Sequence, residues 1–328
     1  MILVGDVGGT KTRFALYEKS GDQLIRKEVK RYDSASAGSF QELAKKFMSE
    51  CSVSGVEKAC FGVPGPVQKG YVQTTNLPWT LSESDLKRDL GIPLIRLVND
   101  LVAFTAAIPF FNPSDLAVLH EGKKERETSL ACVLAPGTGL GMAFLNTIDG
   151  VPHPLASEGG HANFAPNNDL EIELLRFLKR DFPISVSYER LLCGPGLANI
   201  YRFLKETKYA AESPIVAERM KSELPAAVIS GLATQKGDKL CEKTLDMFIA
   251  ILGAHAANLV LTFLATGGVY LGGGIAPRII EKLQDGTIIE AYLQKQRWKE
   301  VVEATPLYVI KDDQAALLGA AVLAQRLR

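Results

Sequence analysis

The sequence predicts a two-domain α/β protein. A length of 328 residues exceeds what one hydrophobic core usually accommodates, because cores stop growing at about 250 to 300 residues. Two strand–glycine–strand units, at residues 2–17 and 130–145, stand far apart in the chain, and helical patterns follow each of them. Because the second unit repeats the first, we expect one unit in each domain, with a cleft between the domains.

The charge balance argues against binding to nucleic acid or to an anionic membrane. The chain has 37 basic and 37 acidic residues and a formal net charge of zero, so small molecules are the expected partners. Five cysteines at wide intervals fit neither a disulfide framework nor a metal knuckle and favour reduced thiols in the cytoplasm. The first residues, MILVGDVGG, lack the basic region of a signal peptide and are typical of a buried strand.

The N-terminal segment predicts a hairpin followed by a helix. Ile2–Val4 and Phe14–Tyr17 are apolar and flank the sequence GGTKT, which indicates two strands joined by a glycine turn. Residues 39–51 begin with Ser39 and Glu42 at the spacing of a capping box, and their apolar residues recur every three to four positions. We therefore expect a helix there.

A strand, a polar pair and a helix follow further along. Residues 59–63 form an apolar run that leads into the sequence PGP. A second run, at residues 95–98, ends at Asn99-Asp100, and apolar residues then share one helical face as far as Pro109. This order places two polar side chains at the junction between a strand and a helix.

The second half of the chain predicts more helix than strand. Leu130–Leu134 leads into PGTGLGMAFLN, which is the second strand–glycine–strand unit, and Val269–Leu271 is an apolar strand that ends in three glycines. We expect the final helix to pack on the N-terminal domain. The expected helices cover residues 168–180, 196–207, 239–265 and 313–326.

Residues 247–265 approach the length of about 20 residues that a membrane span requires. His255, Asn258 and Thr262 interrupt the apolar pattern, and Gly267-Gly268 ends the helix with no basic cluster after it. We therefore expect a buried core helix rather than a transmembrane one.

Both glycine turns have the composition of a phosphate-binding turn. Glycines let backbone N–H groups approach a phosphate, and threonine adds a hydroxyl donor. Neither turn matches a P-loop, and a returning strand follows each turn where a dinucleotide fingerprint requires a helix. Either turn taken alone is also compatible with a plain hairpin. The candidate phosphate-binding residues are Gly8, Gly9 and Thr10 in the first turn and Gly137, Thr138 and Gly139 in the second.

Two such turns, one in each domain, are harder to explain as plain hairpins. Facing each other across a cleft, they would hold the β- and γ-phosphates of a nucleotide from both sides, while Asp6 would bind Mg²⁺ through water. Positioning and charge neutralisation supply most of the catalysis of phosphoryl transfer. The sequence therefore predicts ATP and Mg²⁺ as cofactors.

Six motifs carry a resemblance to the bacterial glucokinases, which are relatives of hexokinase, actin and the chaperone ATPases. They are DVGGTKT, NDLVAF, PGTGLG, SEGGH, YERLLCGPG and YLGGGIAPR, in that order, and the resemblance covers residues 2–325. It implies an actin-like ATPase fold, related to ribonuclease H, with an active-site cleft between a small α/β domain (1–109 plus 305–328) and a large one (110–304). It also implies a homodimer.

The resemblance assigns roles to individual residues. Asp100 would be the catalytic base, accepting the proton of the hexose 6-hydroxyl as the γ-phosphoryl group arrives. Carboxylates and amides form hydrogen bonds with vicinal hydroxyls. The sugar would thus be bound by Asn99, Asp100, Glu158, His161 and Glu189, and the adenosine by the segment of Gly273 and Gly274.

Most of these residues also have a purely structural interpretation. Asp100 is placed to cap the following helix, Glu189 suits a first helical turn, and His161 suits a structural histidine. Lys11, next to the first turn, is better explained as a solvated residue than as a phosphate ligand.

The chain departs from the related ROK sugar kinases, which carry a zinc-binding cysteine cluster after their glycine–histidine segment. After His161 the next cysteines are Cys193 and Cys241, too far apart for a local tetrahedral set. We therefore expect no zinc site.

The sequence thus predicts glucokinase activity, the ATP-dependent conversion of D-glucose to glucose 6-phosphate at the entry to glycolysis. A kinase for another hexose or for an N-acetylhexosamine is the alternative within the same class. An actin-like or chaperone-like ATPase switch is the alternative from a different class, and it would not need the sugar-binding residues.

Overall fold

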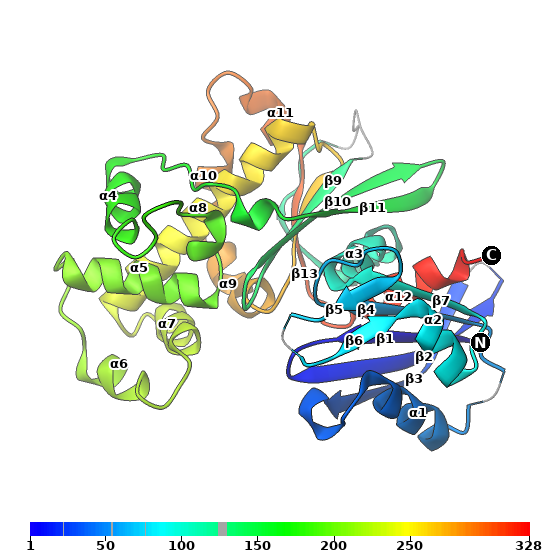
Figure 1. Cartoon of the computed structure of the whole chain (residues 1–328). Coiled ribbons are helices and arrows are strands. Elements are labelled where there is room, and N and C mark those ends of the chain that lie inside the picture. Colours follow the sequence, from blue (N-terminus) through cyan, green and yellow to red (C-terminus); the bar gives the residue numbers. More distant parts are fainter. Residues whose placement is uncertain (22, 54, 76, 124–129) are drawn as a thin grey trace. The chain divides into compact units, whose positions relative to one another are not determined.

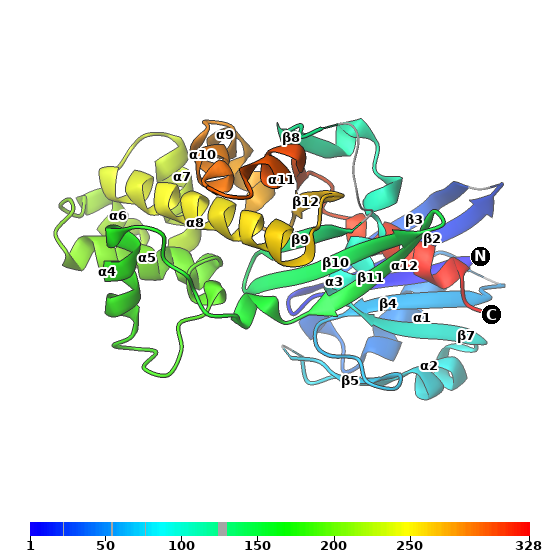
Figure 2. The same cartoon turned by 90° about the horizontal axis from the view of Figure 1, so that it is seen from above.

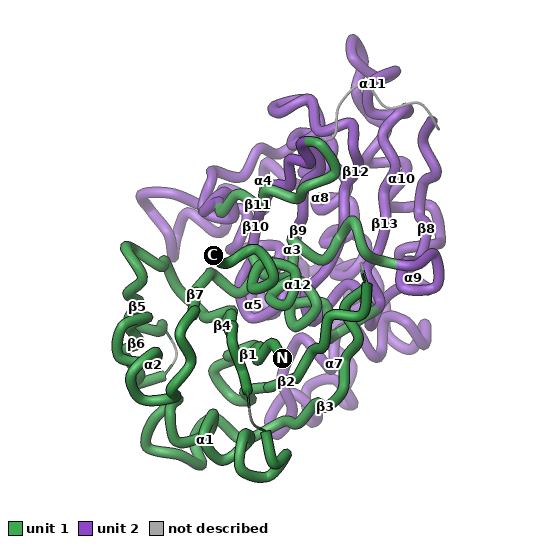
Figure 3. The backbone as a smooth tube through the Cα atoms, turned by 90° about the vertical axis from the view of Figure 1, so that its right-hand side faces the viewer, with its two compact units in different colours: residues 1–111, 149–156, 312–328 green, residues 112–148, 157–311 purple. Residues whose placement is uncertain are grey.

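The computed structural model describes residues 1–21, 23–53, 55–75, 77–123 and 130–328, in two compact units (Figure 3). Unit 1 comprises residues 1–111, 149–156 and 312–328, and unit 2 comprises residues 112–148 and 157–311. These boundaries differ from the predicted domains in three places. Residues 110–111 fall in unit 1. Residues 305–311 fall in unit 2, because β13 (Leu307–Ile310) pairs in parallel with β12 (Gly268–Leu271). Residues 149–156 fall in unit 1, where the Arg326 guanidinium donates to the Pro152 carbonyl at 2.6 Å.

Unit 1 is built on a five-stranded sheet of order β3-β2-β1-β4-β7 (Figure 1). The hairpin predicted at residues 2–17 is confirmed, because β1 and β2 pair antiparallel from Ile2–Tyr17 to Val7–Thr12. β3 pairs antiparallel with β2, whereas β4 is parallel to β1 and β7 is parallel to β4. The strands of unit 1 are β1 (Ile2–Val7), β2 (Lys11–Ser20), β3 (Gln23–Asp33), β4 (Lys58–Val63), β5 (Tyr71–Gln73), β6 (Thr80–Ser82), β7 (Leu94–Asn99) and most of β11 (Val151–Ser157).

Helices cover both faces of this sheet. On one face Phe14 and Phe61 pack with the aromatic side chains of α1 (Phe40–Glu50), and α2 (Glu83–Leu90) joins the same core. On the other face α12 (Ala315–Gln325) packs against β1 and α3 (Asp100–Ala106), as predicted for the C-terminal helix.

The predicted N-terminal cap of α1 is confirmed with one correction. The Ser39 hydroxyl accepts the Glu42 N–H at 3.2 Å. The Glu42 carboxylate, however, accepts the N–H of Gly38 at 3.0 Å, one residue before the position that a capping box uses.

Unit 2 contains strands in the order β10-β9-β12-β13-β8. The second strand–glycine–strand unit is confirmed, since β9 and β10 pair antiparallel around the turn between Pro136 and Leu140. Its further strands are β8 (Leu116–His120), β9 (Ala131–Pro136) and β10 (Leu140–Ile148). Its helices are α4 (Asp169–Leu178), α5 (Gly194–Glu206), α6 (Pro214–Arg219), α7 (Pro225–Thr234), α8 (Lys239–Phe263), α9 (Ile280–Leu283), α10 (Thr287–Leu293) and α11 (Lys299–Ala304).

α8 is the core helix of unit 2 (Figures 1 and 2). It is long and apolar enough to cross a membrane, but 72% of its most hydrophobic window is buried within the structure. α5, α7 and α10 pack against it. The prediction of a buried core helix is therefore confirmed.

Candidate active site

The first glycine turn lies at the end of β1 in unit 1 and is closed by hydrogen bonds from two sides. The Gly8 N–H donates to the Lys11 carbonyl at 3.0 Å. Ser34 braces the turn, since its hydroxyl donates to the Gly8 carbonyl at 2.8 Å and its N–H donates to the Thr10 carbonyl at 2.9 Å. A Cβ on Gly8 would lie 2.8 Å from the Lys11 carbonyl oxygen, which explains the glycine. Gly9 and Thr10 remain exposed at the tip.

Asp6 lies just before this turn, opposite Arg13 in the β1–β2 register. Burial, helped by the negative charges of Asp100 and Asp313 and opposed by Arg13, raises the pKa of the Asp6 carboxyl to about 6. The structure therefore brings together two carboxylates that are 94 positions apart in the sequence, 6 and 100.

Asn99 and Asp100 stand at the junction between β7 and α3. Asn99 is the residue that caps α3, because its side-chain oxygen accepts the N–H groups of Leu101 and Val102 at 3.0 and 3.4 Å. The interpretation of Asp100 as the cap is therefore wrong, although one of its oxygens also accepts the Leu101 N–H at 2.8 Å. The Asn99 amide nitrogen donates to the Gly65 carbonyl at 3.3 Å, so both ends of this side chain have protein partners.

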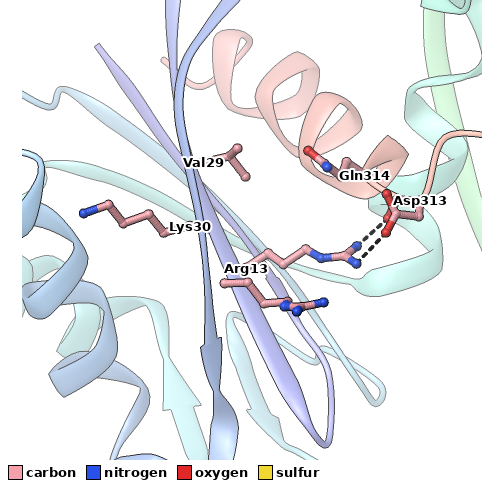
Figure 4. Close-up of a pocket in the computed structure, with 6 residues that line it drawn as sticks. Arg13, Val29, Lys30, Asp313 and Gln314 are labelled. Carbon is pink, nitrogen blue, oxygen red and sulfur yellow. Dashed lines mark hydrogen bonds and ion pairs between the residues drawn. The ribbon is translucent and has the colours of Figure 1, made fainter.

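A hollow of about 230 Å³ opens beside Arg13 on unit 1 (Figure 4). The Arg13 guanidinium donates to the main-chain carbonyl and to the carboxylate of Asp313, each at 2.6 Å. Lys11 forms an exposed ion pair with Asp33 at 2.8 Å. The hollow is lined by Arg13, Val29, Lys30, Arg31, Asp313 and Gln314, so it lies beside the predicted site residues of unit 1 rather than on them.

In unit 2 the structure brings together the predicted sugar-binding residues Glu158, His161 and Glu189. Nε2 of His161 lies 3.9 Å from a Glu158 carboxylate oxygen, and Nδ1 lies 3.8 Å from Oε1 of Glu189. The Glu158 and His161 side chains are 81% and 62% exposed, so a ligand can reach them. Glu189 is 26% exposed, and its Oε2 accepts the Leu140 N–H at 2.9 Å. The imidazole thus lies between two carboxylates.

Backbone pairing between two separate segments creates this cluster. The Phe164 N–H donates to the Val186 carbonyl at 2.8 Å, and the Tyr188 N–H donates to the Ala162 carbonyl at 2.9 Å. Because Ala162 follows His161 and Tyr188 precedes Glu189, the two functional side chains are held next to each other.

The second glycine turn adjoins the same cluster. A Cβ on Gly139 would lie 2.5 Å from Oε2 of Glu189, so only glycine leaves room for this carboxylate. The Gly137 N–H donates to the Gly139 carbonyl at 2.8 Å, and Thr138 is exposed between them. The Gly194 N–H, at the start of α5, donates to the Gly137 carbonyl at 2.9 Å.

The glycine run after β12 packs against this turn. The Gly272 N–H donates to the Leu134 carbonyl at 2.8 Å. Gly273 has a φ of +73°, and a Cβ there would lie 2.6 Å from the Pro136 carbonyl oxygen. Gly273 and Gly274 are exposed. Unit 2 therefore presents its candidate adenosine, phosphate and sugar segments side by side.

Sequence reasoning missed three residues that hold these segments. Ser34 holds the first glycine turn, in unit 1. In unit 2 the Tyr188 ring stacks on the His255 ring, and the Cys193 thiol donates to the Glu189 carbonyl at 2.9 Å. Tyr188 and Cys193 lie in the motif YERLLCGPG, but no local pattern indicates which group any of the three residues contacts. Among the described residues no group of three or more His, Cys, Asp or Glu side chains is arranged to hold a metal ion; the absence of zinc stays a prediction.

Comparison with known proteins identifies the family. The sequence model of the glucokinase family matches residues 3–327. The chain belongs to the glucokinase family. Over 340 residues it is 38% identical to the glucokinase of Nostoc punctiforme, covering 100% of this chain and 99% of that protein.

Solved structures agree with this family assignment. A glucokinase from an Antarctic psychrotroph is 32% identical, with a TM-score of 0.87 over 99% of this chain and 98% of that one. A ROK family glucokinase from Streptomyces griseus, solved with glucose and AMPPNP, shares the fold at 17% identity, with a TM-score of 0.64 over 99% of both chains. The predicted actin-like ATPase fold of this glucokinase family member is confirmed.

Proposed function

We propose that this protein is a cytoplasmic glucokinase that transfers the γ-phosphoryl group of ATP to the 6-hydroxyl of D-glucose, at the entry to glycolysis. The family assignment supports this proposal. The observation that carries it in the structure is the cluster of His161 between Glu158 and Glu189, a set of acceptors and a donor suited to vicinal hydroxyls.

The two units would act as the two domains of a kinase, each with its own glycine turn at the phosphates. In unit 2, Glu158, His161 and Glu189 would bind the sugar hydroxyls. Charge-assisted hydrogen bonds of this kind are about twice as strong as neutral ones. A site built around hydroxyl groups also rejects analogues that lack them, by about 10⁴-fold.

Asp100 would be the catalytic base. As the 6-hydroxyl oxygen forms a bond to the γ-phosphorus, its proton passes to the Asp100 carboxylate, and the bond from the γ-phosphorus to the bridging oxygen breaks to release ADP. Asn99 caps the helix that begins with Asp100 and so fixes the Asp100 carboxylate at the end of β7. The second proposed role of Asp100 is to contact the sugar.

The residues of unit 1 fit a magnesium ion. The negative charge of Asp100 raises the affinity of the Asp6 carboxylate for a proton, and a divalent cation would relieve the same repulsion. Asp6 would hold the ion, through water. When bound, magnesium neutralises charge on the phosphate oxygens.

The test compares Asp100→Asn with Asp149→Asn in a coupled assay of ADP release. Asp149 is a turn residue with φ of +51°, a conformation that asparagine also tolerates, so its variant is the matched control. We expect Asp100→Asn to lower kcat by about 10² to 10⁴-fold while calorimetry still detects glucose binding. Full activity of Asp100→Asn would reject the assignment.

A sugar panel tests the substrate. Glucose should accelerate ATP turnover more than mannose or N-acetylglucosamine does. If no sugar changes the rate of ATP turnover, the protein is an ATPase switch instead.

The proposed homodimer is tested by light scattering, in which a monomer mass contradicts it.

A further inference from the structure

A buried stack of two rings lies behind the Glu158–His161–Glu189 cluster of unit 2. The Tyr188 and His255 rings have centroids 3.6 Å apart and planes at 20°. Tyr188 is 5% and His255 3% exposed. Phe164 contacts the Tyr188 ring edge-on, with centroids 5.8 Å apart. The stack joins α8, which carries His255, to the short turn that carries Glu189.

The histidine of this stack is an unfavourable residue for a buried core. Among the described residues neither ring nitrogen of His255 has a hydrogen-bond partner. Burying an unpaired polar group destabilises a fold by about 1 to 3 kcal/mol, whereas an apolar ring of similar shape avoids that cost. The flat aromatic surface that His255 offers to Tyr188 is therefore the feature to explain.

The Tyr188 hydroxyl is also held in place, by hydrogen bonds. It accepts a hydrogen bond from the Asn258 amide at 3.3 Å and another from the Ala165 N–H. The side-chain oxygen of Asn258, Oδ1, in turn accepts a hydrogen bond from the Lys295 ammonium group at 2.7 Å. A continuous chain of bonds thus runs from Lys295 to the segment that follows His161.

Tyr188 is tied to that segment at two points. Its N–H donates to the Ala162 carbonyl and its hydroxyl accepts from Ala165, so its backbone and ring together set the spacing between residues 162–165 and 188–189. His161 and Glu189, which lie 3.8 Å apart, are the neighbours of these tied residues. A shift of Tyr188 would therefore change the distance between two groups that must meet adjacent hydroxyls.

We propose that Tyr188, held by the His255 ring and by the Asn258–Lys295 bonds, is a positioning residue for sugar binding. This inference rests on the proposed function. Tyr188 does not touch the sugar; it fixes the separation of His161 and Glu189, and sugar affinity falls when that separation is lost.

The experiment uses two pairs of variants of the full chain. Tyr188→Phe removes the hydroxyl and keeps the ring, with Tyr209→Phe, at an exposed tyrosine of unit 2, as its control. His255→Ala removes the stacking surface, whereas His255→Phe restores it without the unpaired nitrogens. For each variant the KM for glucose, the KM for ATP, kcat and the melting temperature are measured.

We expect Tyr188→Phe and His255→Ala to raise the KM for glucose by about five- to tenfold, the loss of roughly one hydrogen bond. The KM for ATP and kcat should change less than about twofold, because uniform sugar binding is what is lost. His255→Phe and Tyr209→Phe should match the wild type.

A lower melting temperature with an unchanged KM for glucose in Tyr188→Phe would overturn the inference, since a merely structural role produces that pattern. Equal increases in both KM values would overturn it as well. If His255→Ala does not fold, Tyr188→Phe decides. A wild type that neither binds glucose nor releases ADP in its presence overturns the proposed function and this inference with it, whereas an active wild type with an unaffected Tyr188→Phe overturns the inference alone.

Discussion

The buried His255 should make unit 2 sensitive to acid. In the unfolded chain its imidazole has a pKa of 6.5, and in the folded unit burial, with the nearby charge of Lys295, lowers that pKa to about 4. Between these values the unfolded state binds more protons than the folded state, so the free energy of unfolding falls as the pH falls. At about pH 5 this single histidine should cost about 2 kcal/mol relative to about pH 7.5.

His255→Phe is the variant that isolates this effect. It keeps a ring against Tyr188 and removes the titratable group, so it should be no less stable than the wild type at neutral pH. Urea unfolding followed by circular dichroism is the assay, because α8, with 25 residues, contributes strongly to the helical signal of unit 2. The wild type should lose about 2 kcal/mol more than the variant between about pH 7.5 and 5. Equal losses in the two proteins would refute the reasoning.

Three glycine substitutions test how tightly the protein packs around individual glycines. A Cβ in Gly319→Ala would overlap the Ala103 carbonyl oxygen where α12 packs on α3, so unit 1 should lose at least about 1 to 3 kcal/mol of stability; an unchanged melting temperature would contradict this. Gly231→Ala, in α7 with nothing within 4 Å, should instead stabilise by about 0.5 to 1 kcal/mol, and a loss of stability would count against the described packing. Gly139→Ala should displace Glu189 and raise the KM for glucose about tenfold, since it removes a charge-assisted bond from Leu140 N–H; a wild-type KM would show that the carboxylate does not need this space.

The sequence determined what depends on neighbouring residues. The apolar runs and glycine turns at residues 2–17 and 130–145 reflect local backbone geometry, so both hairpins could be predicted. The polar pair Asn99-Asp100 at a strand-to-helix junction was predicted for the same reason, although the choice of Asn99 as the cap was not. Both side chains accept the Leu101 N–H, and only their positions in space decide that Asn99 also accepts the Val102 N–H.

Tertiary structure alone decided which distant groups meet. Nothing local to Ser34 indicates that it closes the turn at Gly8, and nothing local to His255 indicates that it lies on Tyr188. Likewise β13 joined unit 2 because its pairing with β12 outweighs its closeness in sequence to α12. Such contacts arise from packing between elements far apart in the chain, where shape and burial, rather than periodicity or turn chemistry, select the partner.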